Sequence, residues 1–138
     1  MRSLALIVTG GSFNNLVQVA TLVRAASGMG VAVRVLFRDA ALLSLRRDRI
    51  AALSFSAEFA GREEQTRQLL AAAEFADLAT FLREAKEHGE DVRFYACTSS
   101  LYYCDTQPHE LIDAIDGPRS LHDFLREDLA PADVVLSF

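Results

Sequence analysis

Cys97 is the residue whose type and position could do chemistry. It ends the apolar run of residues 92–96 and is followed at once by the hydroxyl residues Thr98, Ser99 and Ser100. This pattern predicts a buried strand that leads into a helix, so the thiol lies at the carboxyl edge of a sheet, where open α/β sheets bind ligands. A helix amino terminus and its backbone N–H groups favour the nucleophilic thiolate. The alternative is a buried structural cysteine, because free cysteine is among the most buried residue types.

Cys104 is the second of the two cysteines and follows Cys97 by seven positions. If the intervening residues are helical, the two thiols share a face about 10 Å apart, beyond disulfide reach without local unwinding. A small apolar residue on an inward helix face, beside Tyr102 and Tyr103, is the favoured interpretation of Cys104. A resolving partner for Cys97 is the alternative.

A second polar turn follows the apolar run of residues 4–8 and opens the next helix. It consists of Thr9, Gly10, Gly11 and Ser12. Its amides and hydroxyls can hold an anion at the same sheet edge as Cys97, with Asn14 or Asn15 facing the same hollow. It has neither the glycine spacing nor the lysine of nucleotide-binding loops. The alternative is a tight connection that needs glycine for its backbone angles.

The remaining polar residues do not predict metal or acid–base chemistry. His88, His109 and His122 are scattered, and a set of Cys97, Cys104 and His109 fits no recognised zinc pattern. Neighbouring carboxylates are typical of solvated helix faces. We therefore expect no metal and no cofactor.

Strand patterns alternate with helix patterns along the chain. Near-continuous apolar runs, typical of strands covered on both faces, occupy residues 4–8, 31–37, 92–97 and 134–138. Helix patterns occupy residues 12–28, 39–45 with Asp39 as cap, 66–88 with a break near 73–76, a segment begun by Pro108 with Leu111, Ile112 and Ile115 inward, and 121–125. Residues 46–66 have no clean period, and we expect an ordered insertion there. This alternation predicts a layered α/β sandwich of four or five mainly parallel strands in one domain, residues 1–138.

Composition and charge restrict the function classes. Hydrophobic residues make up 51% of the 138 residues and charged residues 24%, which is typical of a folded domain with its own core. The net charge of -5 argues against sequence-independent nucleic-acid binding. The first apolar run is too short for a signal peptide or a membrane span, so we expect a cytoplasmic protein that does not bind membranes. An apolar fraction this high also fits a protein that buries part of its apolar surface between subunits.

Three segments near the carboxyl half carry a family resemblance. They are VRFYACTSSL at residues 92–101, ELID at 110–113 and LHDFL at 121–125. Together they resemble the DsrE/DsrF-like family of small sulfur-handling proteins, some of them described as peroxiredoxin-like. The turn at residues 9–12 and the apolar run at 31–37 agree with the front half of that family, so the similarity covers nearly the whole chain.

The resemblance implies a flavodoxin-like three-layer sandwich, with helices on both faces, that assembles into homo-oligomers. It also implies that the strand-end cysteine, here Cys97, carries sulfur as a persulfide. Two positions depart from the family pattern: Leu101 stands where members tend to have methionine, and Asp105 where they tend to have glycine. The wall altered by these changes consists of Tyr102, Tyr103 and Cys104.

We therefore expect an intracellular sulfurtransferase that takes sulfur from a donor protein and passes it to a thiol of an acceptor protein. Thr98, Ser99, Ser100 and the turn at residues 9–12 would stabilise the anionic persulfide. Two alternatives stay open. One is a non-catalytic oligomeric module that binds a small molecule beside Cys97, and the other is a Cys97–Cys104 redox switch.

Overall fold

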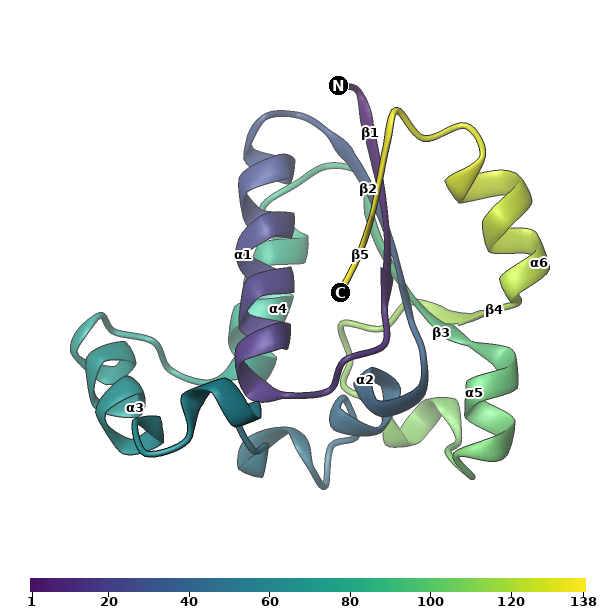
Figure 1. The fold of residues 1–138 in the computed structure, drawn as a ribbon. Coiled ribbons are helices and arrows are strands. Elements are labelled where there is room, and N and C mark those ends of the chain that lie inside the picture. The colour runs from purple at the N-terminus through teal and green to yellow at the C-terminus, as the bar shows by residue number, and fades with distance from the viewer.

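One five-stranded sheet organises the chain. In the computed structural model, which describes all of residues 1–138, the strands lie in the order β4-β3-β2-β1-β5 and every neighbouring pair is parallel (Figure 1). The strands are β1 (Ser3–Val8), β2 (Ala32–Phe37), β3 (Val92–Cys97), β4 (Gly117–Arg119) and β5 (Val134–Ser137). The three central strands are the apolar runs of the sequence, which fits a sheet covered on both faces.

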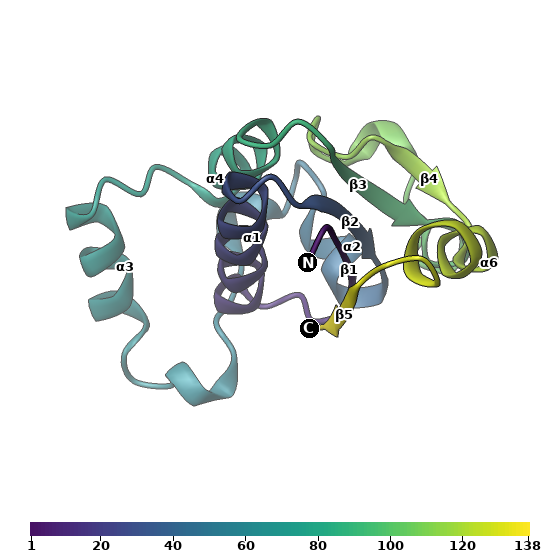
Figure 2. The same ribbon diagram turned by 90° about the horizontal axis from the view of Figure 1, so that it is seen from above.

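Helices cover the two faces of the sheet unequally. The long helices α1 (Phe13–Gly28) and α4 (Leu78–Glu87) pack together on one face, and α6 (Leu121–Asp123) with the π-helical turn η4 (Phe124–Leu129) covers the other (Figure 2). The other helical segments are α2 (Asp39–Ser44), η1 (Ile50–Ala52), η2 (Ala57–Phe59), α3 (Glu63–Ala72), α5 (Thr98–Tyr103) and η3 (Pro108–Glu110). This arrangement confirms the predicted flavodoxin-like three-layer α/β class. No helix has the length and apolar character needed to span a membrane.

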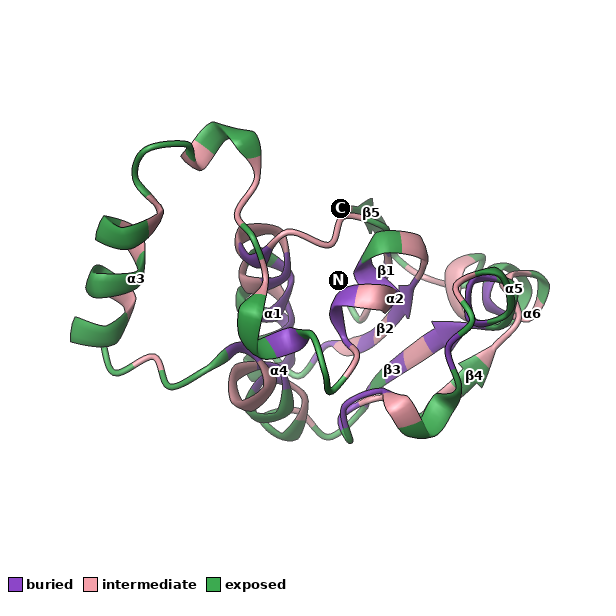
Figure 3. Cartoon of the chain, turned by 90° about the horizontal axis from the view of Figure 1, so that it is seen from below, coloured by how far each residue is buried: buried purple, intermediate pink, exposed green.

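The main core lies between the sheet and the pair α1 and α4. The apolar stripe of α1 is fully buried there, and the rings of Phe37 and Phe94 meet edge to face at 5.5 Å between centroids. A smaller cluster on the opposite face contains Ala5, Leu36 and Phe124 together with Cys97. Helix α3 stands apart from the sheet and contributes no buried residue (Figure 3). The two faces of the sheet therefore differ: one is a thick apolar core and the other a thin layer.

Two predictions of local structure need correction. Pro108 begins only the single turn η3, because Leu111 forms an isolated bridge with Arg46 and the Ile112 amide donates to the Leu45 carbonyl. Asp39 does not cap α2 with its side chain: it is the first helical residue, with a φ of 52° in the left-handed region. The predicted break between residues 66 and 88 is confirmed, since α3 ends at Ala72 and α4 begins at Leu78.

Candidate functional site

Cys97 is the last residue of β3 and is completely buried, with 0% of its surface exposed. Successive side chains of a strand point to opposite faces. That of Cys97 points to the thin layer, where it belongs to the cluster with Leu36 and Phe124. The main cavities of the molecule lie elsewhere, and none of them is lined by Cys97. The thiol therefore sits at the predicted strand end, but under a cover rather than in an open pocket.

The thiol is surrounded by hydrogen-bond donors. Its Sγ lies 3.3 Å from the Ser99 hydroxyl oxygen. Burial acts to raise the pKa of Cys97, but the Ser99 hydroxyl, the Ser100 and Ser99 amides and the Arg38 guanidinium together outweigh burial and lower it. Because α5 has only six residues, we attribute the lowered pKa to these individual donors rather than to the dipole of a long helix.

Arg38 is a candidate site residue that the sequence pattern did not identify. It follows β2 directly, two positions after Leu36, so its side chain starts on the same face of the sheet as Cys97. Its Nε is buried and donates to no acceptor, and the residue forms no ion pair with any carboxylate. A buried donor without a partner costs about 1–3 kcal/mol. An anionic sulfur next to Cys97 is a natural partner for this donor.

Ser100 and Asp39 hold the two sides of the site together. The Ser100 hydroxyl donates to the Asp39 carboxylate at 3.0 Å and accepts from the Asp39 amide at 3.1 Å. The Tyr103 hydroxyl lies 3.1 Å from the same oxygen. These contacts join the start of α5 to the turn that carries Arg38, so the Ser100 and Tyr103 side chains shape the site without facing the thiol. Thr98 is exposed, and Tyr102 is 89% exposed.

The turn between β1 and α1 lies at the same sheet edge, but two of its backbone donors are engaged by the carboxyl-terminal residue. The amides of Thr9 and Gly10 both donate to the Phe138 carbonyl, at 2.7 and 3.3 Å. Gly11 approaches α2 so closely that a Cβ there would collide with the Ala40 carbonyl oxygen. These contacts favour the tight-connection interpretation of the turn over an anion site.

Asn14 and Ser12 do not face Cys97. The Ser12 hydroxyl caps α1 by accepting from the Asn15 amide at 3.2 Å. The Asn14 side-chain amide donates to the Ser56 hydroxyl at 3.0 Å and accepts from the Ser56 amide at 2.8 Å. Both residues line a separate surface cavity that does not include Cys97. The structure therefore places these sequence-predicted residues apart from the thiol.

Cys104 lies away from Cys97 in a different environment. Both thiols are free, and Cys104 packs against the main core whereas Cys97 belongs to the cluster on the opposite face. Burial and the nearby Asp39 carboxylate raise the pKa of Cys104. The pKa values of the two thiols are thus shifted in opposite directions.

All three histidines are exposed, and no group of three or more His, Cys, Asp or Glu side chains could hold a metal ion.

The opposite shifts predict different pH profiles for the two thiols. The rate of alkylation of Cys97 should reach half its maximum below the ordinary cysteine value of about 8.5, and that of Cys104 above it. Peptide-level mass spectrometry after timed N-ethylmaleimide pulses over a pH series measures both thiols in one sample, so Cys104 serves as the internal reference. Coincident or reversed midpoints would refute the assignment of Cys97 as the thiolate.

Comparison with known proteins supports the fold but gives no information about the chemistry. No protein-family model and no curated protein matches the chain. The structure is similar to that of a protein of unknown function, MTH1491 from Methanobacterium thermoautotrophicum, with a TM-score of 0.60 and 14% identity over 99% of each chain. At that identity, the likeness concerns the fold alone.

Proposed function

We propose that this protein carries sulfur as a persulfide on Cys97 and passes it to an acceptor thiol, as its sequence resemblance to the DsrE/DsrF-like family implies. The observation that carries the proposal is the Arg38 side chain: its Nε is buried and unpaired, and its guanidinium is one of the donors that lower the pKa of Cys97. A structural cysteine needs no such donor. A persulfide anion on Cys97 would give Arg38 the acceptor that it lacks.

Loading and discharge are two exchange reactions that need no external oxidant. In loading, the Cys97 thiolate attacks the terminal sulfur of a donor persulfide, the Cys97 Sγ–S bond forms and the donor leaves as a thiolate. In discharge, the acceptor thiolate attacks the terminal sulfur held on Cys97, the Sγ–S bond breaks and Cys97 leaves as a thiolate. The sulfur atom moves and the number of thiolates is unchanged in each step.

The same donors serve both steps. Exchange rates rise with the thiolate fraction of the attacking cysteine and with the acidity of the departing one. The contacts from Ser99 and Arg38 that lower the pKa of Cys97 therefore help it to attack during loading and to leave during discharge. Burial excludes water and small reductants from the loaded sulfur.

The two alternatives find less support around Cys97. A redox switch needs the two thiols within disulfide reach, but they pack against different apolar clusters. A small-molecule module built on Cys97 needs a cavity there, and the main cavities are lined by other residues.

Sulfur loading by intact mass tests the proposal. We expect the wild-type protein and Cys104→Ser to gain the mass of one sulfur atom after incubation with glutathione persulfide, and Cys97→Ser to gain none. Cys104→Ser is the matched control because it removes the other free thiol and leaves the donors around Cys97 in place. Equal loading of Cys97→Ser and wild type would contradict the proposal, as would no loading of either.

A further inference from the structure

The segment formed by α6 and η4, residues 121–129, covers the thiol. Phe124 is completely buried in the cluster that contains Cys97, and Leu121 and Leu129 pack around that cluster. An acceptor thiolate must reach the sulfur on Cys97 in line with the bond that breaks. The observed closed arrangement leaves no path for a protein side chain, so the covering segment must move before sulfur can enter or leave.

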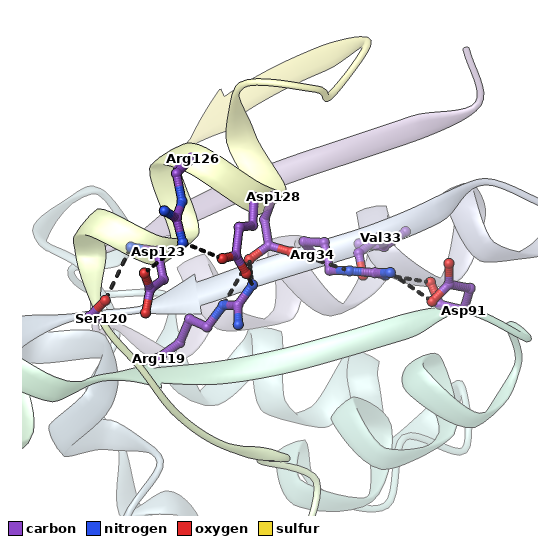
Figure 4. A network of polar contacts seen from close by, with 9 residues as sticks. Val33, Arg34, Asp91, Arg119, Ser120, Asp123, Arg126 and Asp128 are labelled. Atoms are coloured by element: carbon purple, nitrogen blue, oxygen red, sulfur yellow. Dashed lines mark hydrogen bonds and ion pairs between the residues drawn. The ribbon is translucent and has the colours of Figure 1, made fainter.

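A partly buried ion pair fastens this segment to the sheet beside the thiol (Figure 4). The Asp128 side chain is only 7% exposed; its Oδ2 accepts a hydrogen bond from Arg119 Nε at 3.0 Å and lies 2.9 Å from Arg119 Nη2 in the ion pair. Arg34 Nε on β2 lies 3.6 Å from the other carboxylate oxygen. Arg119 is the register partner of Cys97 in the β3–β4 pair, so the ion pair holds the segment down next to the thiol.

Arg119 itself is held on the face of the sheet. Its guanidinium carbon lies 5.1 Å from the centre of the Tyr95 ring, and Glu127 accepts from its Nη2 at 2.8 Å. Tyr95 is two residues before Cys97 on β3 and shares its face. The Tyr95 contact holds Arg119 independently of the covering segment, whereas the Glu127 contact is a second ion pair between that segment and the sheet.

The covering segment is built to open locally. Phe124–Leu129 is a π-helical turn, a rare form that is less stable than an α-helix and is often found at functional sites. Leu125, Arg126 and Glu127 in its middle are exposed. Apart from the apolar anchors around Phe124, its polar contacts with the sheet are the ion pairs of Asp128 with Arg119 and Arg34 and that of Glu127 with Arg119. Few buried contacts and an irregular backbone are the marks of a segment that opens without global unfolding.

We propose that residues 121–129 form a lid over Cys97 and that the Arg119–Asp128 ion pair is the latch that keeps it closed. With the latch formed, Cys97 is sealed from thiols in solution. With the latch broken, the π-helical turn lifts Phe124 away and the sulfur becomes accessible from the thin face of the sheet. The purpose of the lid rests on the proposed function of Cys97, whereas its existence does not.

Labelling of Cys97 by N-ethylmaleimide tests the lid in a Cys104→Ala background, so that one thiol reports. We expect Asp128→Asn to be labelled about tenfold faster than the parent, because the loss of the Asp128 charge removes the ion pairs with Arg119 and Arg34; a tenfold change corresponds to ~1.4 kcal/mol. Arg119→Met should show a similar increase. Because the two residues share a direct contact, the double variant should be labelled more slowly than the product of the two single effects predicts.

Arg126→Met is the matched control. Arg126 belongs to the same segment, but it is exposed and its ion pairs, with Asp123 and Glu127, stay inside the segment. Its removal should leave the labelling rate near that of the parent. Parental labelling of Asp128→Asn, or equally fast labelling of Arg126→Met, would overturn the latch.

The urea dependence of labelling separates local opening from global unfolding. Lid opening exposes little surface, so the labelling rate of Asp128→Asn should rise only shallowly with urea, whereas global unfolding gives a steep rise. A slope equal to that of global unfolding would overturn the lid. These measurements use no sulfur donor, so the lid can hold when persulfide loading fails, and loading can occur when the lid fails.

Discussion

Replacing Arg38 by methionine should slow the sulfur loading of Cys97 at neutral pH by ~3-fold or more. The Arg38 guanidinium helps to lower the pKa of the Cys97 thiol, so its loss should raise that pKa and reduce the fraction of the reactive thiolate. The loaded persulfide would also lose the donor that faces it. The rate of sulfur mass gain with glutathione persulfide measures the effect.

The same substitution should leave the free energy of unfolding unchanged or raise it. Arg38 Nε has no partner in the unloaded protein, and removing a buried, unsatisfied donor relieves a cost of about 1–3 kcal/mol. A residue that weakens the fold while it assists the site is the pattern expected of functional residues. Urea denaturation of Arg38→Met and wild type measures this difference.

Arg93→Met is the matched control for Arg38→Met. Arg93 is an exposed arginine of β3, four residues before Cys97, and its Nη1 donates to the Val92 carbonyl at 3.1 Å. Its loss changes the net charge equally but leaves the contacts of the thiol intact, so loading should proceed at the wild-type rate. Equal loading by Arg38→Met and wild type would remove Arg38 from the site.

Gly11→Ala should destabilise the protein by about 1–3 kcal/mol, as overpacking of a tight contact does. A Cβ at Gly11 would collide with the backbone carbonyl of Ala40 and with the Ser44 hydroxyl. The Ser44 hydroxyl also donates to the Gly11 carbonyl at 2.6 Å, so the β1–α1 turn and α2 form one rigid contact. Because α2 begins directly after Arg38, its displacement should also slow sulfur loading.

Gly10→Ala is the comparison for Gly11→Ala. A Cβ at Gly10 would meet the end of the Asn15 side chain, 2.8 Å from Nδ2, and a flexible side chain can move aside where a backbone carbonyl cannot. Urea denaturation should therefore find Gly10→Ala more stable than Gly11→Ala. An equal or smaller loss of stability in Gly11→Ala would contradict the close contact between the turn and α2.

Local sequence signals were sufficient for much of the fold. The apolar run of residues 92–96 gave the position of β3, and the glycine and cap patterns gave the bounds of α1, because burial and capping act over a few residues. The three-residue strand β4 was not recognised, since Gly117–Arg119 carries no apolar run. Its pairing with β3 depends on contacts between segments that the sequence pattern does not express.

The site was predicted only in part for the same reason. Cys97 could be placed at a strand end from its neighbours in the chain. Arg38 could not be placed near Cys97 from the sequence, because its position follows only once β2 and β3 are known to pair in this register. The alternation of Arg34, Leu36 and Arg38 along β2 was the available signal. The burial of Cys97 under Phe124 likewise depends on how residues 121–129 cross the face of the sheet. The sequence pattern instead predicted that Cys97 lies at a sheet edge open to ligands.

A complete sulfur cycle on isolated protein tests the central claim most directly. Wild-type protein is loaded with glutathione persulfide, freed of the donor and mixed with an excess of an acceptor thiol, and its intact mass is followed over time. We predict that one sulfur atom is gained on the peptide that contains Cys97 and is then lost to the acceptor, with the free Cys97 thiol restored for a second round. Sulfur that loads on another residue, or that stays on Cys97 when the acceptor is added, would contradict a carrier function.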